Sequence, residues 1–132
     1  MMLNKILNSM MLAGLMLLIL MSTLVFSQIA PPQNLKATVE GSTVKLNWTA
    51  TETGATYNIY RATANTSAKV IDPAKLEFKK LNTVTEPAYE DKTDATSGMV
   101  YVYYVATLNA NGVESAGSNY VNAKIGETGT DQ

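Results

Sequence analysis

The sequence predicts an all-β protein, a seven-stranded antiparallel β-sandwich. Residues 100–108 are rich in aromatic and β-branched side chains and contain neither Gly nor Pro, as is typical of a strand packed on a pleated sheet. Apolar and polar residues alternate in several shorter runs, which are separated by turn-forming Gly, Asn and Ser residues. No segment between residues 34 and 126 shows the periodicity of an amphipathic helix.

Length and composition exclude several classes of function. The 132 residues suffice for one domain of ordinary size, and the net charge of −1 argues against nucleic-acid binding, which needs a basic surface. The chain has no Cys and no His, so it has no thiolate chemistry, no disulfide and none of the usual zinc ligands. We therefore expect no cofactor and no metal, and a fold held together by core packing alone.

Residues 1–27 have the pattern of a secretory signal peptide. Lys5 supplies a positive charge, an apolar stretch follows, and Ser27 precedes a suitable cleavage point before Gln28. The apolar stretch of about 17 residues is also near the lower limit for a membrane-spanning helix, so residues 6–26 could instead remain as an anchor. We expect an extracellular or periplasmic location, and membrane association only if this hydrophobic helix is retained.

The remaining chain divides into a Pro-rich lead-in at residues 28–33, a domain at residues 34–126 and a polar tail at residues 127–132. Residues 62–75 read as a long loop. Besides residues 100–108, strands are expected at residues 35–40, 44–49, 57–61, 76–78, 88–91 and 120–125.

The expected core is centred on the only Trp. In residues 44–49, Val44, Leu46 and Trp48 alternate with polar residues, so these three side chains should face inward. We expect Trp48 to pack against Tyr57, Ile59, Tyr103 and Val105. The predicted core residues are Trp48, Tyr57, Ile59, Tyr101, Tyr103 and Val105.

Six segments in this order resemble the fibronectin type III module, an immunoglobulin-like sandwich. They are residues 32–37 (PQNLKA), 44–48 (VKLNW), 57–61 (YNIYR), 88–91 (AYED), 101–105 (YVYYV) and 109–115 (NANGVES). The resemblance implies sheets A-B-E and C′-C-F-G, an extracellular setting, and roles in cell adhesion, spacing or docking. It also implies that Tyr101 is the tyrosine-corner residue, with its hydroxyl bonded to the preceding loop. The integrin-binding Arg-Gly-Asp tripeptide is absent from residues 109–115.

An acidic cluster and two Asn-X-Ser/Thr sequences are weaker candidate sites. Glu90, Asp91 and Asp94 could bind Ca²⁺ but lack the alternating oxygen ligands of a dedicated loop, and they could equally accept hydrogen bonds at a strand end. Asn47 and Asn65 begin acceptor sequences for N-glycosylation, of which only the second lies in an expected loop. We assign no catalytic residue.

Tyr60 and Tyr104 form the more interesting candidate site. The fibronectin type III resemblance implies that their two strands are neighbours. By alternation both residues fall on the outward side, and Val102 and Leu108 share that face. Tyrosines combine a large apolar ring with a polar tip, which suits contact with sugars or partner proteins, including a second copy of the chain. The alternative is a cross-strand pair that only stabilises the sheet.

The sequence thus indicates a non-catalytic extracellular binding or structural module that contacts protein or carbohydrate. One alternative is a surface subunit tethered to the membrane by its leader. Another is an accessory module of an extracellular enzyme.

Overall fold

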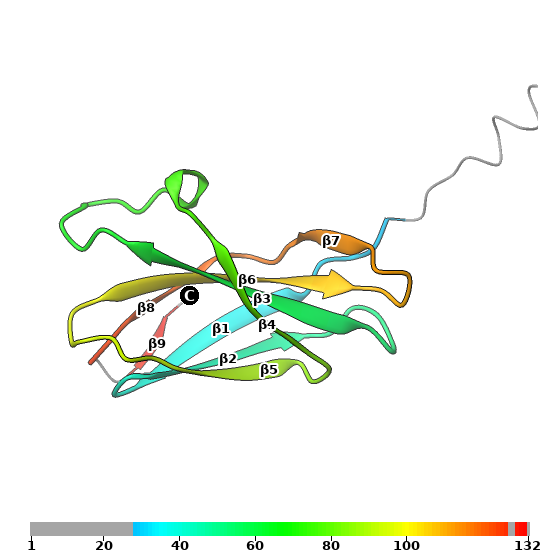
Figure 1. Cartoon of the computed structure of the whole chain (residues 1–132), viewed down its shortest axis with the longest axis horizontal. Helices are drawn as coiled ribbons and strands as arrows, with labels where there is room; N and C mark the ends of the chain where they lie inside the picture. The colour runs from blue at the N-terminus through cyan, green and yellow to red at the C-terminus, as the bar shows by residue number, and fades with distance from the viewer. Residues whose placement is uncertain (1–27, 127–128, 132) are drawn as a thin grey trace, which may run out of the picture.

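The computed structural model describes residues 28–126 and 129–131 (Figure 1). The predicted signal helix and its cleavage point or anchor, at residues 1–27, lie outside the described residues, as does part of the predicted polar tail. Within the described ranges, no helix is long and apolar enough to cross a membrane.

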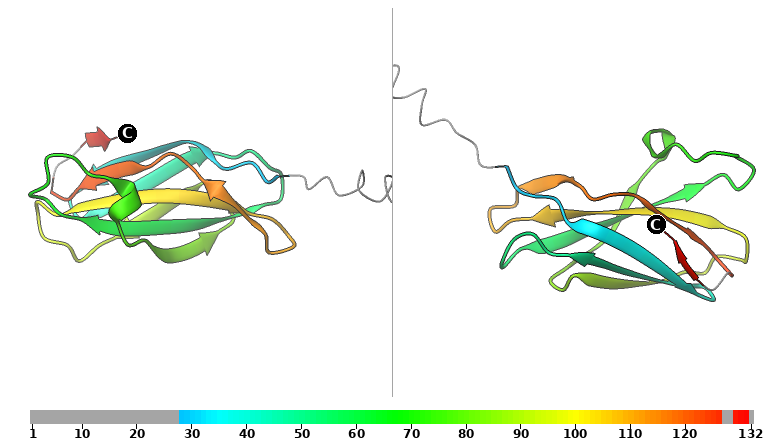
Figure 2. Two further views of the ribbon diagram at one scale, coloured as in Figure 1. Left: turned by 90° about the horizontal axis from the view of Figure 1, so that it is seen from above. Right: turned by 180° about the vertical axis from the view of Figure 1, so that it is seen from behind.

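Nine strands of the described residues form two antiparallel sheets packed face to face (Figures 1 and 2). The strands are β1 (Gln33–Glu40), β2 (Thr43–Thr49), β3 (Thr56–Ala64), β4 (Lys79–Val84), β5 (Ala88–Lys92), β6 (Val100–Leu108), β7 (Glu114–Gly117), β8 (Val121–Lys124) and β9 (Gly129–Asp131). One sheet has the order β5-β2-β1-β9. The other has the order β4-β3-β6-β7, with β8 also paired to β6. The predicted two-sheet architecture is confirmed.

The sequence prediction missed two strands. β7 lies where a turn was expected, and β9 lies within the predicted polar tail. The polar residues of β7 hid it, because its pairing with β6 is completed by side chains: the backbone amides of Val105 and Thr107 donate to the hydroxyls of Ser118 and Ser115. β9 is only three residues long and pairs with residues 37–39 in the second half of β1, an interaction that no local sequence pattern indicates.

The expected fourth strand is displaced. It was predicted at residues 76–78, whereas β4 begins at Lys79, after a 3₁₀ turn η1 (Pro73–Lys75). Asp72 caps this turn by accepting a hydrogen bond from the backbone amide of Ala74, and Pro73 occupies its first position. The turn directs the long β3–β4 connection over the outer side of the β4-β3-β6-β7 sheet (Figure 2).

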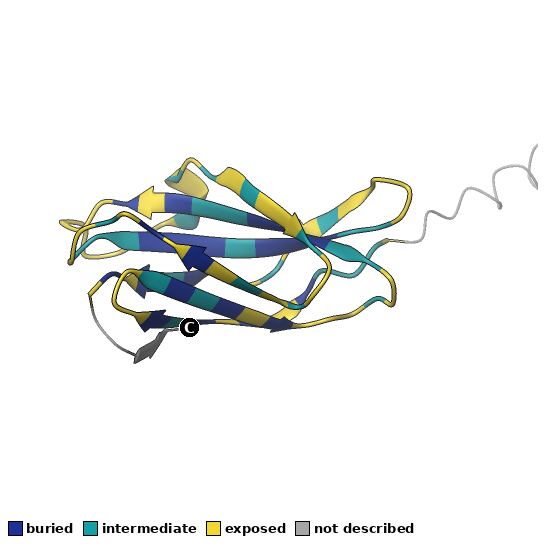
Figure 3. Cartoon of the chain, turned by 60° about the horizontal axis from the view of Figure 1, so that its bottom comes forward, coloured by how far each residue is buried: buried dark blue, intermediate teal, exposed yellow. Residues whose placement is uncertain are grey.

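The core lies between the sheets and contains all six predicted core residues. Trp48 retains 6% of its exposed area, and its ring meets that of Tyr57 edge-on at 5.3 Å between centroids. Buried residues alternate with half-buried or exposed ones along β2. Figure 3 colours each strand by burial and shows both alternating and longer buried stretches. The predicted inward faces of β2 and β3 are therefore confirmed.

Asn119 joins the two sheets at one open edge of the sandwich. Its side-chain amide accepts a hydrogen bond from the backbone N–H of Leu35 and donates one to the carbonyl of the same residue, both at 3.0 Å. Asn34, with φ of 56°, precedes this contact in a stretch where the register of β1 shifts. A single side chain thus supplies the two bonds that a neighbouring strand would otherwise make.

Candidate functional site

An aromatic pair lies on the outer side of the β4-β3-β6-β7 sheet. Tyr60 of β3 and Tyr104 of β6 stand opposite each other in the strand register, and their rings stack at 4.6 Å with 12° between the planes. Both side chains are half-buried. The expected placement of both residues on the outward side of neighbouring strands is confirmed.

Two further rings extend this pair into a cluster. Phe78, just before β4, lies 4.9 Å from the Tyr104 ring, and Tyr120, just before β8, lies 5.6 Å from both Phe78 and Tyr104. We call Tyr60, Phe78, Tyr104 and Tyr120 the aromatic face. Sequence reasoning missed Phe78 and Tyr120, because the only signal is an aromatic residue at the end of each loop.

The predicted patch of Tyr60, Val102, Tyr104 and Leu108 needs a correction. Val102 is completely buried, and Leu108 is half-buried. Val102 belongs to the outward side of β6, but its side chain is fully covered by its neighbours in the folded domain. Val102 is therefore not part of an exposed surface.

Gly117 of β7 leaves room for the Tyr104 ring. A Cβ atom at position 117 would lie 2.9 Å from Cδ2 of Tyr104, closer than such atoms approach in proteins. Any side chain here would push the Tyr104 ring away from β7 and toward Tyr60. Gly117 thus leaves the space that the central ring of the aromatic face occupies.

A polar chain borders the aromatic face. The Glu114 carboxylate accepts hydrogen bonds from the Tyr60 hydroxyl at 2.8 Å and from the Asn58 amide at 2.7 Å. Thr83 donates to the other end of the Asn58 amide at 2.6 Å. Asn58 is only 3% exposed, so these bonds satisfy a buried amide and hold the Glu114 carboxylate in place.

Tyrosine ionisation should limit stability at alkaline pH. Burial, together with the hydrogen bond to Glu114, raises the pKa of Tyr60 to about 12, and burial also raises the pKa values of Tyr57, Tyr103 and Tyr104. The neutral tyrosines favour the folded state, so their contribution to the free energy of unfolding is complete below about pH 10, the ordinary pKa of tyrosine. This contribution is lost as the pH rises through the raised pKa values of the folded state.

A titration of tyrosinate absorbance, followed together with near-ultraviolet circular dichroism, checks this prediction. We expect a fraction of the tyrosines to ionise only as the tertiary signal disappears. Complete ionisation near about pH 10 with an unchanged tertiary signal would contradict it.

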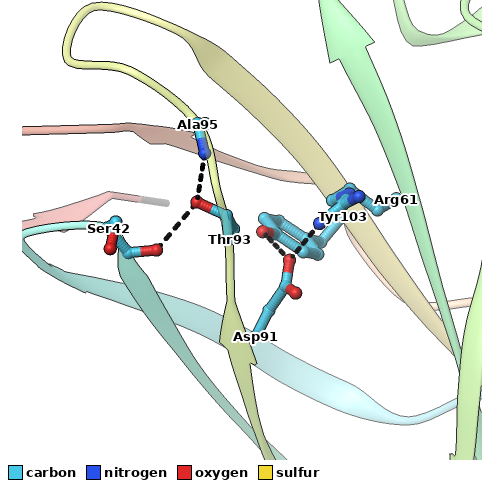
Figure 4. Close-up of polar contacts among 6 residues, drawn as sticks. All are labelled: Ser42, Arg61, Asp91, Thr93, Ala95 and Tyr103. Carbon is cyan, nitrogen blue, oxygen red and sulfur yellow. Dashed lines mark hydrogen bonds and ion pairs between the residues drawn. The ribbon is translucent and has the colours of Figure 1, made fainter.

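The expected acidic cluster is divided by the fold. Asp91 points between the sheets and is 6% exposed, whereas Glu90 and Asp94 are exposed. One Asp91 oxygen accepts hydrogen bonds from the Tyr103 hydroxyl at 2.6 Å and from the Arg61 guanidinium at 2.8 Å (Figure 4). Asp91 lies in one sheet and its two partners in the other, so the ion pair joins the sheets.

This arrangement corrects two expectations for the acidic residues. Asp91 accepts hydrogen bonds from the side chains of Arg61 and Tyr103, and not from backbone amides at a strand end. It also does not form one site with Glu90 and Asp94. Among the described residues, no group of three or more acidic side chains could hold a metal ion.

No family model matches the chain. Among solved structures, an Fn3-like protein from Clostridium thermocellum is 28% identical, with a TM-score of 0.58 over 78% of this chain and 99% of that one. Its agreement with the two-sheet topology decides the fold. The chain is an Fn3-like β-sandwich domain.

Two curated relatives connect this Fn3-like domain with much larger enzymes. It is 37% identical over 93 residues to the amylopullulanase of Thermoanaerobacter thermohydrosulfuricus, a match that covers 70% of this chain and 6% of the enzyme. It is 32% identical over 88 residues to the amylopullulanase of Thermoanaerobacterium thermosulfurigenes, a match that covers 67% of this chain and 4% of the enzyme. The Fn3-like module is a non-catalytic domain type, and here it is similar to a small segment of each enzyme.

The tyrosine-corner prediction for Tyr101 is wrong in this Fn3-like domain. No hydrogen bond from the Tyr101 hydroxyl to the preceding loop occurs in the described part of the chain. Instead the Arg61 guanidinium lies over the Tyr101 ring, with its Cζ atom 4.4 Å from the ring centroid. The hydroxyl that donates to a residue near the end of β5 belongs to Tyr103, and its acceptor is Asp91. The two residues share the inward face of β6, so alternation along the strand could not distinguish them.

Proposed function

We propose that this Fn3-like domain is a non-catalytic accessory module that works with an extracellular polysaccharide-degrading enzyme. The observation that carries the proposal is its similarity to segments of two amylopullulanases, enzymes named for the polysaccharide pullulan. Each match is a small part of the enzyme, as expected for one module among several.

The chemistry of the domain supports a role without catalysis. The chain has no His and no Cys, and the buried carboxylate of Asp91 is already held by Arg61 and Tyr103. A carboxylate that is paired and buried between the two sheets is poorly placed for proton transfer with a substrate. The reaction would therefore be supplied by the enzyme and not by this domain.

The shape of the domain suits a module placed in series with others. The described chain enters at one end of the elongated sandwich, and β9 lies toward the opposite end (Figure 2). Neighbouring domains attached at opposite ends can act on the same substrate without covering the sheets between them.

Export of the domain is part of the proposal. The pattern of residues 1–27 supports secretion, and a membrane-tethered surface subunit is the alternative. N-terminal sequencing of the protein from its host distinguishes them: secretion predicts a chain beginning at Gln28, and a retained anchor predicts the uncleaved leader.

Segment exchange in a relative tests the accessory role. In the Thermoanaerobacter thermohydrosulfuricus amylopullulanase, the matching stretch of 93 residues is either replaced by the aligned residues of this chain or deleted. Pullulan hydrolysis and the thermal midpoint are then compared with those of the unaltered enzyme. We expect the exchanged enzyme to resemble the unaltered one, and the deletion to lower activity, thermal midpoint or both. The proposal fails if the exchanged enzyme behaves like the deletion, or if the deletion has no effect.

A further inference from the structure

We propose that the aromatic face, with Tyr120 as its exposed ring, is a binding site for neutral glucan chains. This inference rests on the proposed function, because the amylopullulanase similarity supplies the polysaccharide as the class of ligand. The location and the chemistry of the site come from the described side chains.

Tyr120 presents an exposed ring on a fixed backbone. Its residue remains 47% exposed although its ring contacts both Phe78 and Tyr104. The preceding residue, Asn119, is held by two hydrogen bonds to Leu35, and the following residue, Val121, is buried in β8. An exposed ring that is already fixed loses little conformational entropy when a ligand stacks on it.

The aromatic face continues from this ring toward a hydrogen-bonding group. Tyr104 lies between Tyr120 and Tyr60, with ring separations of 5.6 Å and 4.6 Å. Beyond Tyr104, the exposed Glu114 carboxylate is held by Tyr60 and Asn58. A sugar has apolar C–H groups that can stack on a ring and hydroxyl groups that can donate to a carboxylate. The order of rings and carboxylate fits a chain of sugars lying across the sheet.

A protein partner fits this face less well. The exposed large apolar side chains of the described residues are Val70, Val113 and Tyr120, which belong to three different connections between strands. Stable protein interfaces bury about 800 Å² on each partner around an apolar centre. One exposed ring with half-buried neighbours offers a small contact, which is adequate for individual sugars. The carboxylate of Glu114 also disfavours an anionic polysaccharide.

Affinity electrophoresis of the chain through gels containing pullulan tests the site. We expect pullulan to retard the chain and Tyr120→Ala to weaken the binding about tenfold, the effect of losing roughly 1.4 kcal/mol of ring contact. Val113→Ala is the matched control, because it removes an exposed apolar side chain outside the aromatic face and should leave retardation unchanged. Near-ultraviolet circular dichroism of each variant verifies that the surroundings of Trp48 are intact.

Several results would overturn the proposal. They are no retardation by pullulan or amylose, equal retardation of Tyr120→Ala, and equal retardation by polygalacturonate, an anionic polysaccharide. A dimer in sedimentation that Tyr120→Ala dissociates, without glucan binding, would reassign the face to self-association.

Segment exchange separates this inference from the accessory role. A functional exchanged amylopullulanase whose inserted domain does not bind glucan would overturn the site and leave the role intact. Glucan binding that depends on Tyr120, together with a failed exchange, would support the site and overturn the role.

Discussion

Replacement of Asp91 by alanine should lower the free energy of unfolding by about 3 kcal/mol, near the lower end of the range for breaking a buried ion pair. The lower end applies because the Arg61 side chain keeps 27% of its exposed area and water can reach its charge. The Tyr103 hydroxyl would also lose its acceptor inside the core. Urea denaturation followed by circular dichroism measures the change.

Two matched variants show where that cost arises. Tyr103→Phe removes one hydrogen bond to a charged group and keeps the ion pair, so we expect a smaller loss of about 1.5–3 kcal/mol. Replacing Asp91 and Arg61 together by apolar residues should recover part of the loss, because no unpaired charge remains. If Asp91→Ala costs less than Tyr103→Phe, the ion pair does not join the sheets as described.

Replacement of Trp48 by alanine should lower the free energy of unfolding by about 3–5 kcal/mol, the usual cost of removing a large aromatic side chain from a core. Trp48 is 6% exposed and packs edge-on against Tyr57, so its loss leaves a cavity between the sheets. Against a typical stability of about 5–15 kcal/mol, this loss is severe. Urea denaturation monitored by far-ultraviolet circular dichroism measures it without needing the Trp signal.

Trp48→Phe is the matched control. The Nε1 atom of Trp48 is buried and has no hydrogen-bond partner in the described ranges, so phenylalanine removes no hydrogen bond and keeps an aromatic ring in the core. We expect a clearly smaller loss than for alanine. Equal losses for the two variants would show that ring packing at this position does not stabilise the sandwich.

Strand alternation predicted most of the fold. Val44, Leu46 and Trp48 lie on one face because successive residues of a strand point to opposite sides, and a buried sheet face permits only one register. Alternation also placed Tyr60 and Tyr104 on the outward side, and the fibronectin type III resemblance implied that their strands are neighbours, as β3 and β6 are. These features follow from local patterns that the tertiary structure preserves.

The contacts of the candidate site could not be predicted in this way. Alternation placed Val102 on the outer side of β6 but could not show that its side chain is completely buried there. Phe78 and Tyr120 join Tyr104 across large separations in sequence, through contacts that depend on how the loops fold back. The sequence grouped Asp91 with Glu90 and Asp94, because its actual partners, Arg61 and Tyr103, approach it only when the two sheets pack.

Gly117 and Tyr104 should evolve as a pair. The ring occupies the space that a side chain at position 117 would need, with a separation of 2.9 Å to the hypothetical Cβ. In a homologous domain, a residue larger than glycine at this position therefore requires a smaller or differently oriented residue in place of Tyr104. A lineage that loses the glycine would also lose Tyr104 as the centre of the aromatic face. One substitution in the short edge strand β7 can therefore change which aromatic rings this sheet presents to solvent.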